Sequence, residues 1–163
     1  CALPISETAK TLALSQVETN YLVRLVQHHA GSHSLVSSGM IPSRREVYRF
    51  FRSAGEAGIT ASLLSLADTW AAYGKSLPMA VWEERLEICR VLFSAWYDHN
   101  SEQVNPALLI NGDDLLQYLN IEQGPVVGEI LSALREAQAV GEILDRQTAL
   151  RFAQTLAEAK TDK

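Results

Sequence analysis

One helix is expected to begin in the stretch Asn111-Gly112-Asp113-Asp114-Leu115, and the next helix in Gln123-Gly124-Pro125-Val126-Val127-Gly128. Asn111 or Gly112 suits the N-cap of the first helix, and Gly124 with Pro125 suits the cap and first turn of the second. The leading amides of a helix lack intrahelical partners and carry partial positive charge, so both starts also suit an anion such as phosphate. Capping is the commoner role, and both interpretations stay open.

The rest of the chain has the same helical character. Capping boxes at Ser15-Gln16-Val17-Glu18 and Ser43-Arg44-Arg45-Glu46 begin two further helices, and apolar side chains recur at helical spacing in every long segment. No segment shows the alternating pattern of a strand bounded by hairpin turns. The sequence therefore predicts an all-α fold, built as a multi-helix array.

The apolar positions predict how these helices pack. The helix after Ser43 should bury Val47, Phe50, Phe51 and Ala54 and end near Gly55 or Gly58. The next helix, over 59–73, is apolar around most of its circumference and is predicted to be central. A long helix over 79–98 follows, and helices over 112–119, over 125–140 and after Asp145 complete the chain. Asn105-Pro106 marks a boundary between a helical body (1–104) and a helical tail subdomain (105–163).

Composition restricts the class of protein. The 163 residues carry a net charge of −5 and are 47% hydrophobic, and no apolar run reaches the roughly 18 residues that a membrane span needs. The two cysteines, Cys1 and Cys89, form no CxxC pair, which favours a cytoplasmic location over a disulfide or zinc framework. Because the chain begins with Cys and has no signal peptide, we expect it to be part of a longer protein.

The strongest local charge lies on the helix after Pro42. Arg44, Arg45, Arg49 and Arg52 are four of the 14 Lys and Arg residues, although the chain is acidic overall. Arg45, Arg49 and Arg52 recur at i, i+4 and i+7 and therefore share one face, where their charges repel. A polyanion would offset this repulsion, because arginine binds phosphate oxygens through charge-assisted hydrogen bonds. The alternative is a solvated basic face balanced by nearby acids.

His28, His29 and Asp68 are the candidate metal ligands. Imidazole and carboxylate groups suit Mg, Mn, Fe or Zn, but three ligands are an incomplete set. A structural role is the alternative, since histidines near the end of a helix interact favourably with its dipole. No G-x-S-x-G, P-loop or G-x-G-x-x-G motif is present, and no catalytic residue is assigned.

The C-terminal third resembles the corresponding part of bacterial CCA-adding tRNA nucleotidyltransferases and the related poly(A) polymerases. The resemblance rests on four motifs: Pro106-Ala107-Leu108-Leu109-Ile110-Asn111-Gly112-Asp113-Asp114-Leu115, Gly124-Pro125-Val126-Val127-Gly128, Arg135-Glu136-Ala137-Gln138 and Gly141-Glu142-Ile143. Upstream, the helix ending in His28-His29 and the step Leu66-Ala67-Asp68 resemble the closing half of an HD-type phosphohydrolase domain. The nucleotidyltransferase head, with its paired aspartates, and the His-Asp doublet of the HD fold are not in this sequence.

The resemblance implies a non-catalytic, tRNA-binding C-terminal region whose partner is an N-terminal catalytic part of the same protein. RNA phosphates would contact Arg44, Arg45, Arg49 and Arg52, with the amides near Gly112 and Gly124 as secondary contacts. It also implies that Asp68 and one of the two histidines match metal ligands, so that the longer protein would use Mg or Mn while this region holds no cofactor.

Two other functions remain open. The chain could be part of an HD-type metal-dependent phosphohydrolase, with His28, His29 and Asp68 completing its site. It could also be a helical module that forms a homodimer, because the helix over 79–98 has many Trp and Phe side chains to bury.

Overall fold

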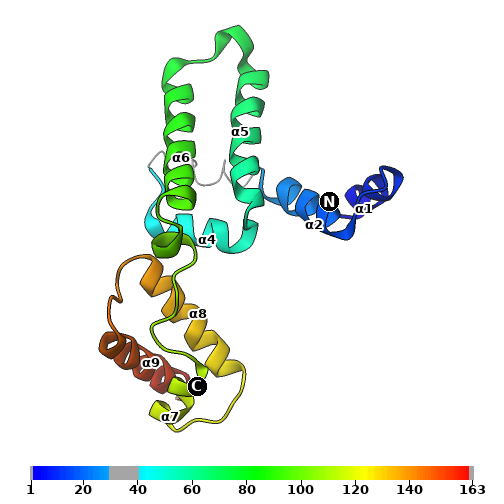
Figure 1. Cartoon of the computed structure of the whole chain (residues 1–163). Helices are drawn as coiled ribbons and strands as arrows, with labels where there is room; N and C mark the ends of the chain where they lie inside the picture. The colour runs from blue at the N-terminus through cyan, green and yellow to red at the C-terminus, as the bar shows by residue number, and fades with distance from the viewer. Residues whose placement is uncertain (1, 30–40, 162–163) are drawn as a thin grey trace. The chain divides into compact units, whose positions relative to one another are not determined.

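Helices make up all the regular structure in the computed structural model, which describes residues 2–29 and 41–161 (Figure 1). No strand occurs in these two ranges, so the predicted all-α, multi-helix fold is confirmed. The elements are α1 (Ala2–Thr11), α2 (Gln16–His28), α4 (Arg44–Ala54), α5 (Ala57–Tyr73), the 3₁₀ turn η1 (Gly74–Ser76), α6 (Met79–Tyr97), the π-helical turn η2 (Asn100–Val104), α7 (Gly112–Leu119), α8 (Pro125–Ala139) and α9 (Arg146–Thr161).

The chain divides into two compact units, Cys1–Asp98 and His99–Lys163. The sequence places a domain boundary after residue 104, within the second unit and directly after η2. The division into a body (1–104) and a tail subdomain (105–163) stays a prediction.

In the first unit, α4 is amphipathic as the sequence predicts. Ser43 caps it in a reciprocal box with Glu46, whose carboxylate accepts the Ser43 backbone N–H at 2.7 Å. The helix ends at Gly55, and its buried side chains are Val47, Tyr48, Phe50, Phe51 and Ala54. Two ring contacts fix this face, because the Phe51 ring lies 5.2 Å from Phe50 and 5.0 Å from Trp96 of α6. Burying one face of α4 leaves its opposite face for polar side chains.

Helices α5 and α6 run side by side and are joined by η1 (Figure 1). Helix α5 packs against α2, α4 and α6, which agrees with its predicted central position. It does not bury most of its circumference, since it leaves Leu63 49%, Leu64 37% and Trp70 59% exposed. Its buried residues are mainly small: Ala57, Gly58, Ile59, Ala61, Ser62, Ser65 and Thr69.

The physical reason is close helix packing. A methyl group at Gly58 would lie 2.8 Å from a ring carbon of Phe50, so the aromatic rings of α4 occupy the space that a side chain would need. The Ser62 and Thr69 hydroxyls donate to the carbonyls of Ile59 and Ser65, which allows small polar residues to be buried without a lost hydrogen bond. Of the large apolar side chains of α5, Ile59 is buried, whereas Leu63, Leu64 and Trp70 are exposed to solvent.

Helix α2 differs in a similar way from its predicted apolar side. Its capping box, Ser15 with Glu18, is present, but none of its residues is buried and Val17 is 78% exposed. The predicted stop at Gly31 lies outside the described residues, and the structure ends α2 at His28 with His29 as C-cap.

The second unit is a small helical cluster formed by α7, α8 and α9 (Figure 1). Its core consists of side chains that are almost fully buried: Ile110, Leu115, Val127, Ile130, Leu134, Ala137, Ile143, Ala149 and Ala153. These residues come from the end of the segment before α7, from all three helices and from the α8–α9 connection, so the core fixes the start of α7 against α8 and α9.

Candidate nucleic-acid interface

The arginines predicted to contact RNA lie on the exposed side of α4. Arg44, Arg45, Arg49 and Arg52 are all exposed, while the phenylalanines between them are buried. Arg45 and Arg49 also interact with other groups of the chain. No ion pair is recorded for Arg44 or Arg52 within residues 2–29 and 41–161. The fold therefore brings the predicted basic row together on one surface, which we call the arginine face.

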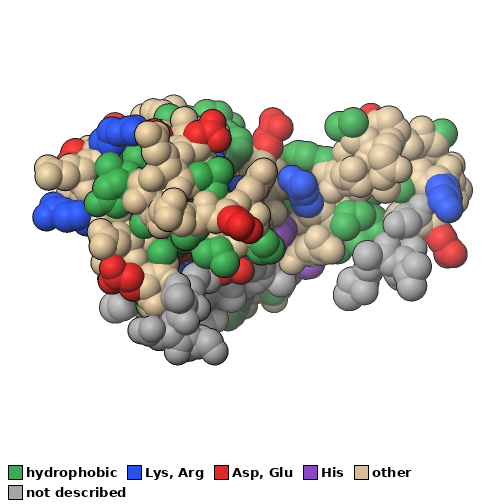
Figure 2. All heavy atoms as spheres, turned by 90° about the horizontal axis from the view of Figure 1, so that it is seen from below, with side chains coloured by type: hydrophobic (Ala, Val, Ile, Leu, Met, Phe, Trp, Pro, Cys, Tyr) green, Lys and Arg blue, Asp and Glu red, His purple; other side chains and the backbone are tan. Residues whose placement is uncertain are grey.

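This row contrasts with the distribution of charge elsewhere. On the face of the molecule drawn in Figure 2, Lys and Arg side chains lie at separate points among Asp and Glu, and no broad positive area forms. The net charge of −5 likewise indicates that the chain as a whole does not attract a polyanion. Any attraction of a polyanion must therefore come from local groups rather than from a general positive potential.

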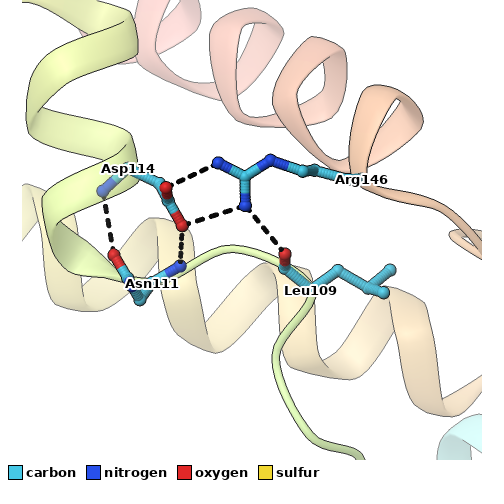
Figure 3. Close-up of polar contacts among 4 residues, drawn as sticks. All are labelled: Leu109, Asn111, Asp114 and Arg146. Carbon is cyan, nitrogen blue, oxygen red and sulfur yellow. Dashed lines mark hydrogen bonds and ion pairs between the residues drawn. The ribbon is translucent and has the colours of Figure 1, made fainter.

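In the second unit, α7 is capped at its N-terminus by its own residues Asn111 and Asp114 (Figure 3). The Asp114 N–H donates to Asn111 Oδ1 at 2.9 Å, and the Asn111 N–H donates to Asp114 Oδ2 at 2.8 Å. Of the two N-cap candidates that the sequence offers, Asn111 is the N-cap, and Gly112 is the first helical residue. An anion at Gly112 would meet the Asp114 carboxylate on the same turn.

Arg146 holds that carboxylate from α9 (Figure 3). Its Nη2 donates to Asp114 Oδ1 at 2.6 Å and its Nη1 to Oδ2 at 3.2 Å, and Nη1 also lies 3.4 Å from the Leu109 carbonyl oxygen. The sequence analysis does not identify Arg146, because 32 residues separate it from Asp114 and no local pattern links them. This bidentate pair ties the start of α9 to the capping box of α7.

Gln138 of α8 forms hydrogen bonds with the backbone of residues 107–109, just before α7. Its side-chain Nε2 donates to the Ala107 carbonyl at 2.8 Å, and its Oε1 accepts the Leu109 N–H at 3.3 Å. The sequence places Gln138 in the RNA-family motif without a role, and the structure gives it a structural one. Because Gln138 and Arg146 both bond to residues 107–109, helices α8 and α9 together fix the path of this segment.

These contacts predict a pH dependence. The hydrogen bonds from Arg146, and then that from the Asn111 N–H, lower the pKa of Asp114 below its ordinary value of 3.8. A depressed folded-state pKa means that the stabilisation is complete above the unfolded pKa and is lost as the pH falls through the folded pKa. We expect the Asp114→Asn variant to lose less stability than the wild-type chain on acidification below about pH 4.

Thermal unfolding followed by circular dichroism across that range would measure this difference. Asp113→Asn is the control, because it removes the same charge from the adjacent exposed position of α7. Equal pH profiles for Asp114→Asn and the wild-type chain would contradict the assigned ion pair.

The start of α8 is open by comparison with that of α7. Gly124 is its N-cap, without a side-chain cap, and Pro125 occupies the first turn. Methyl groups at Gly124 and Gly128 would meet no atom within 4 Å, and neither glycine needs a positive φ. A methyl group at Gly112 would lie 3.9 Å from Val127 Cγ1, so the starts of α7 and α8 are neighbours. The backbone is therefore uncovered at Gly124 and Gly128, while the side chains of Pro125 and Val126 between them are exposed.

The three predicted metal ligands have separate roles in the structure. The His28 ring packs edge-on against Phe50 with centroids 6.4 Å apart, the His29 Nδ1 donates to the Val26 carbonyl at 2.6 Å, and Asp68 is exposed on α5. Among the described residues, no group of three or more His, Cys, Asp or Glu side chains is arranged to hold a metal ion. A role for these residues in a metal site of a longer protein stays a prediction.

Comparisons with known proteins give one consistent family. The model of the family described as tRNA nucleotidyltransferase domain 2 matches residues 61–153. The A-adding tRNA nucleotidyltransferase of Deinococcus radiodurans is 36% identical over 96 residues, which are 58% of this chain and 21% of that protein. The CC-adding tRNA nucleotidyltransferase of a Synechocystis species is 31% identical over 68 residues, or 42% of this chain and 16% of that protein.

These matches have clear limits. The chain spans about one fifth or less of the length of these two relatives. No solved structure matches it. The family match begins at residue 61, so the HD-like character expected for the start of the chain stays a prediction. No helix in the described part of the chain is long and apolar enough to span a membrane.

Proposed function

The chain belongs to the tRNA nucleotidyltransferase domain 2 family, and from this premise we propose that it binds tRNA through the phosphate backbone without catalysing a reaction itself. In a longer protein of the kind that its relatives represent, it would hold the tRNA while another part transfers nucleotides. The metal-dependent transfer chemistry, with Mg or Mn, would belong to that other part, in the cytoplasm where tRNA is processed.

The arginine face is the single observation that carries this proposal. Three guanidinium groups at i, i+4 and i+7 project from one exposed side of a helix whose other side is anchored in the core. A row of this kind can follow successive phosphates of one strand, because each guanidinium offers a planar fork of donors. Contacts of this type position an RNA without reading its sequence, which suits a protein that must accept many tRNAs.

The first turn of α8 supports a second contact. No side chain caps this helix start. Pro125 has no N–H and the Val127 N–H donates to the Gly124 carbonyl at 3.1 Å, so the Val126 amide is the one first-turn donor proposed for a phosphate. Gly124 and Gly128 leave room for a sugar-phosphate strand to approach the backbone. The capped start of α7 at Gly112 is less suitable, since the Asp113 and Asp114 carboxylates would repel phosphate there. We therefore place the secondary RNA contact at Gly124 and Gly128 ahead of Gly112.

Binding of the 163-residue chain to a tRNA transcript, measured by fluorescence anisotropy at several salt concentrations, tests the proposed function. We expect the logarithm of the association constant to fall linearly with the logarithm of salt concentration, because bound phosphates release counterions. Absence of binding at 50 mM salt would reject the proposal.

The Gly128→Ala substitution is expected to change tRNA affinity and protein stability in opposite directions. Alanine has a higher helix propensity than glycine, and the added methyl group meets no other atom, so we expect stability to rise by about 0.5–1 kcal/mol. The same methyl group would stand between the backbone and an RNA strand, so tRNA affinity should fall severalfold.

Thermal unfolding and anisotropy on the same sample measure both effects. Ser132→Ala, at an exposed position one turn further along α8, is the matched control and should leave affinity unchanged. Unchanged affinity in Gly128→Ala, together with the expected rise in stability, would remove the α8 start from the proposed interface.

A further inference from the structure

The tip of the α5–α6 hairpin presents aromatic and apolar side chains to solvent. Trp70 is 59% exposed, Tyr73 46% and Met79 67%. The first two lie on the last turns of α5, and Met79 begins α6. Such exposure follows from the packing of α5 through its small residues, and it brings large apolar side chains together at one end of the hairpin.

Two of these side chains, Trp70 and Met79, line a cavity of about 280 Å³. The residues that form it are Trp70, Gly74, Lys75, Leu77, Met79 and Trp82. The indole rings of Trp70 and Trp82 meet edge to face, with centroids 5.8 Å apart and planes at 66°. An edge-to-face pair leaves ring faces uncovered, so one planar group can stack on Trp70 while Trp82 bounds the cavity.

Hydrogen bonds within η1 and the end of α5 hold the turn beside the cavity. Gly74 has φ +53°, a conformation that favours glycine, and its N–H donates to the Trp70 carbonyl as the C-cap of α5. The Ser76 hydroxyl donates to the Tyr73 carbonyl at 2.7 Å. These bonds hold Lys75 at the rim of the cavity, between the two tryptophan-bearing helices.

The local charge suits an anionic guest. Lys75 is the one charged residue among those that line the cavity, and no carboxylate lines it, although Asp68 and Glu83 lie just outside residues 69–82 of the sequence. A planar guest that also carries a phosphate would stack on the indole and place its negative charge near the Lys75 ammonium. Nucleotides have this combination of a flat ring system and an adjacent phosphate, and aromatic platforms with nearby cations are a general means of binding unpaired bases.

We propose that the Trp70–Trp82 cavity binds one unpaired nucleobase of a bound RNA, which stacks on Trp70 while Lys75 contacts the neighbouring phosphate. This inference rests on the proposed function, since it names a second site for the same class of ligand. The size of the cavity suits one small flat group such as a base. Its volume is near the lower end of the roughly 300–1,000 Å³ of small-molecule pockets.

Two substitutions of Trp70 test the stacking. Trp70→Leu keeps an apolar side chain but removes the ring face, and Trp70→Phe keeps a smaller ring. The probes are a tRNA transcript, a short oligoadenylate and an abasic ribose-phosphate oligonucleotide of the same length. Stacking of one base contributes about 1–3 kcal/mol, so Trp70→Leu should bind oligoadenylate roughly five- to a hundredfold more weakly, and Trp70→Phe should lose much less.

Further readouts identify the role of each residue. The abasic oligonucleotide should bind wild type and Trp70→Leu equally, and Trp70→Leu should leave the salt dependence unchanged. Lys75→Gln should reduce the slope of log affinity against log salt by about 0.7, the value for one single-strand phosphate contact. Circular dichroism would verify that the exposed substitutions leave the helices intact.

The outcomes separate this proposal from the one before it. If tRNA binds the chain and neutralising the arginine face weakens that binding, but Trp70→Leu binds oligoadenylate as the wild type does, the stacking site is wrong and the proposed function stands. A wild-type dimer in light scattering that Trp70→Leu dissociates would also overturn the stacking site, in favour of a second copy of the chain.

Discussion

Neutralising Arg45, Arg49 and Arg52 together, as the glutamine variants, is expected to weaken tRNA binding by roughly ten- to a hundredfold at low salt. Each guanidinium that contacts a phosphate contributes a charge-assisted hydrogen bond and releases a counterion. The slope of log affinity against log salt should therefore become shallower by about two to three. Anisotropy titrations with a tRNA transcript between 50 and 200 mM salt would measure both quantities.

A control with the same total charge is available in the chain. Replacing Lys10, Arg90 and Arg151 with glutamine removes three positive charges from exposed positions of other helices, so both triple variants carry −5 − 3 = −8. If binding depended on net charge alone, the two variants would lose equal affinity. We expect the control to retain most of the affinity and salt dependence, and equal losses would contradict a specific role for the arginine face.

Truncating Leu134 to alanine is expected to destabilise the second unit by about 2–5 kcal/mol. Leu134 is fully buried in the core that joins α7, α8 and α9, and a leucine deleted from such a site leaves a cavity that the neighbours fill only in part. Because the same core positions the start of α8, the variant should also lose the RNA contact at Gly124 and Gly128. Chemical denaturation followed by circular dichroism would measure the change in stability.

Leu144→Ala is the matched control for this variant. The same side chain is removed, but Leu144 is 80% exposed in the connection before α9. The change in its free energy of unfolding should stay within about 0.5 kcal/mol, as is usual for surface substitutions. A comparable loss in both leucine variants would show that the assigned core of unit two is wrong.

Local signals in the sequence predicted much of the fold. The capping boxes at Ser15 and Ser43 are present as predicted, and α4 buries its phenylalanines on the face opposite Arg45 and Arg49. Features of this kind depend on residues within one or two turns of each other, so a single sequence contains the information needed to find them.

The packing of α5 could not be predicted in this way. A helix that is apolar on all sides has no preferred face in its periodicity, and the choice is made by close approach to the rings of Phe50 and Phe51 at Gly58. The sequence places apolar residues around most of this helix and predicts a central position for it, whereas the structure exposes Leu63 and Trp70. This difference matters for function, because the exposed Trp70 forms part of the proposed base-stacking site.

Long-range polar contacts were the other omission. Arg146 reaches Asp114 across 32 residues, and Gln138 reaches Ala107 across 31. Asp114 alone looks like an ordinary first-turn acid, so nothing near it indicates an arginine partner. Contacts of this kind require the tertiary arrangement of α7, α8 and α9. Of the two helix starts that the sequence offers as anion sites, they leave Gly124 as the one that we propose.

The arginine side chains themselves provide the most direct test of the arginine face. Nuclear magnetic resonance can follow the Nε–H signals of ¹⁵N-labelled arginine while a tRNA transcript is added to the 163-residue chain. We predict that the signals of Arg45, Arg49 and Arg52 shift on binding and that the signal of Arg90, an exposed arginine of α6 outside the arginine face, does not. Saturating tRNA that leaves all three α4 signals in place would contradict the account.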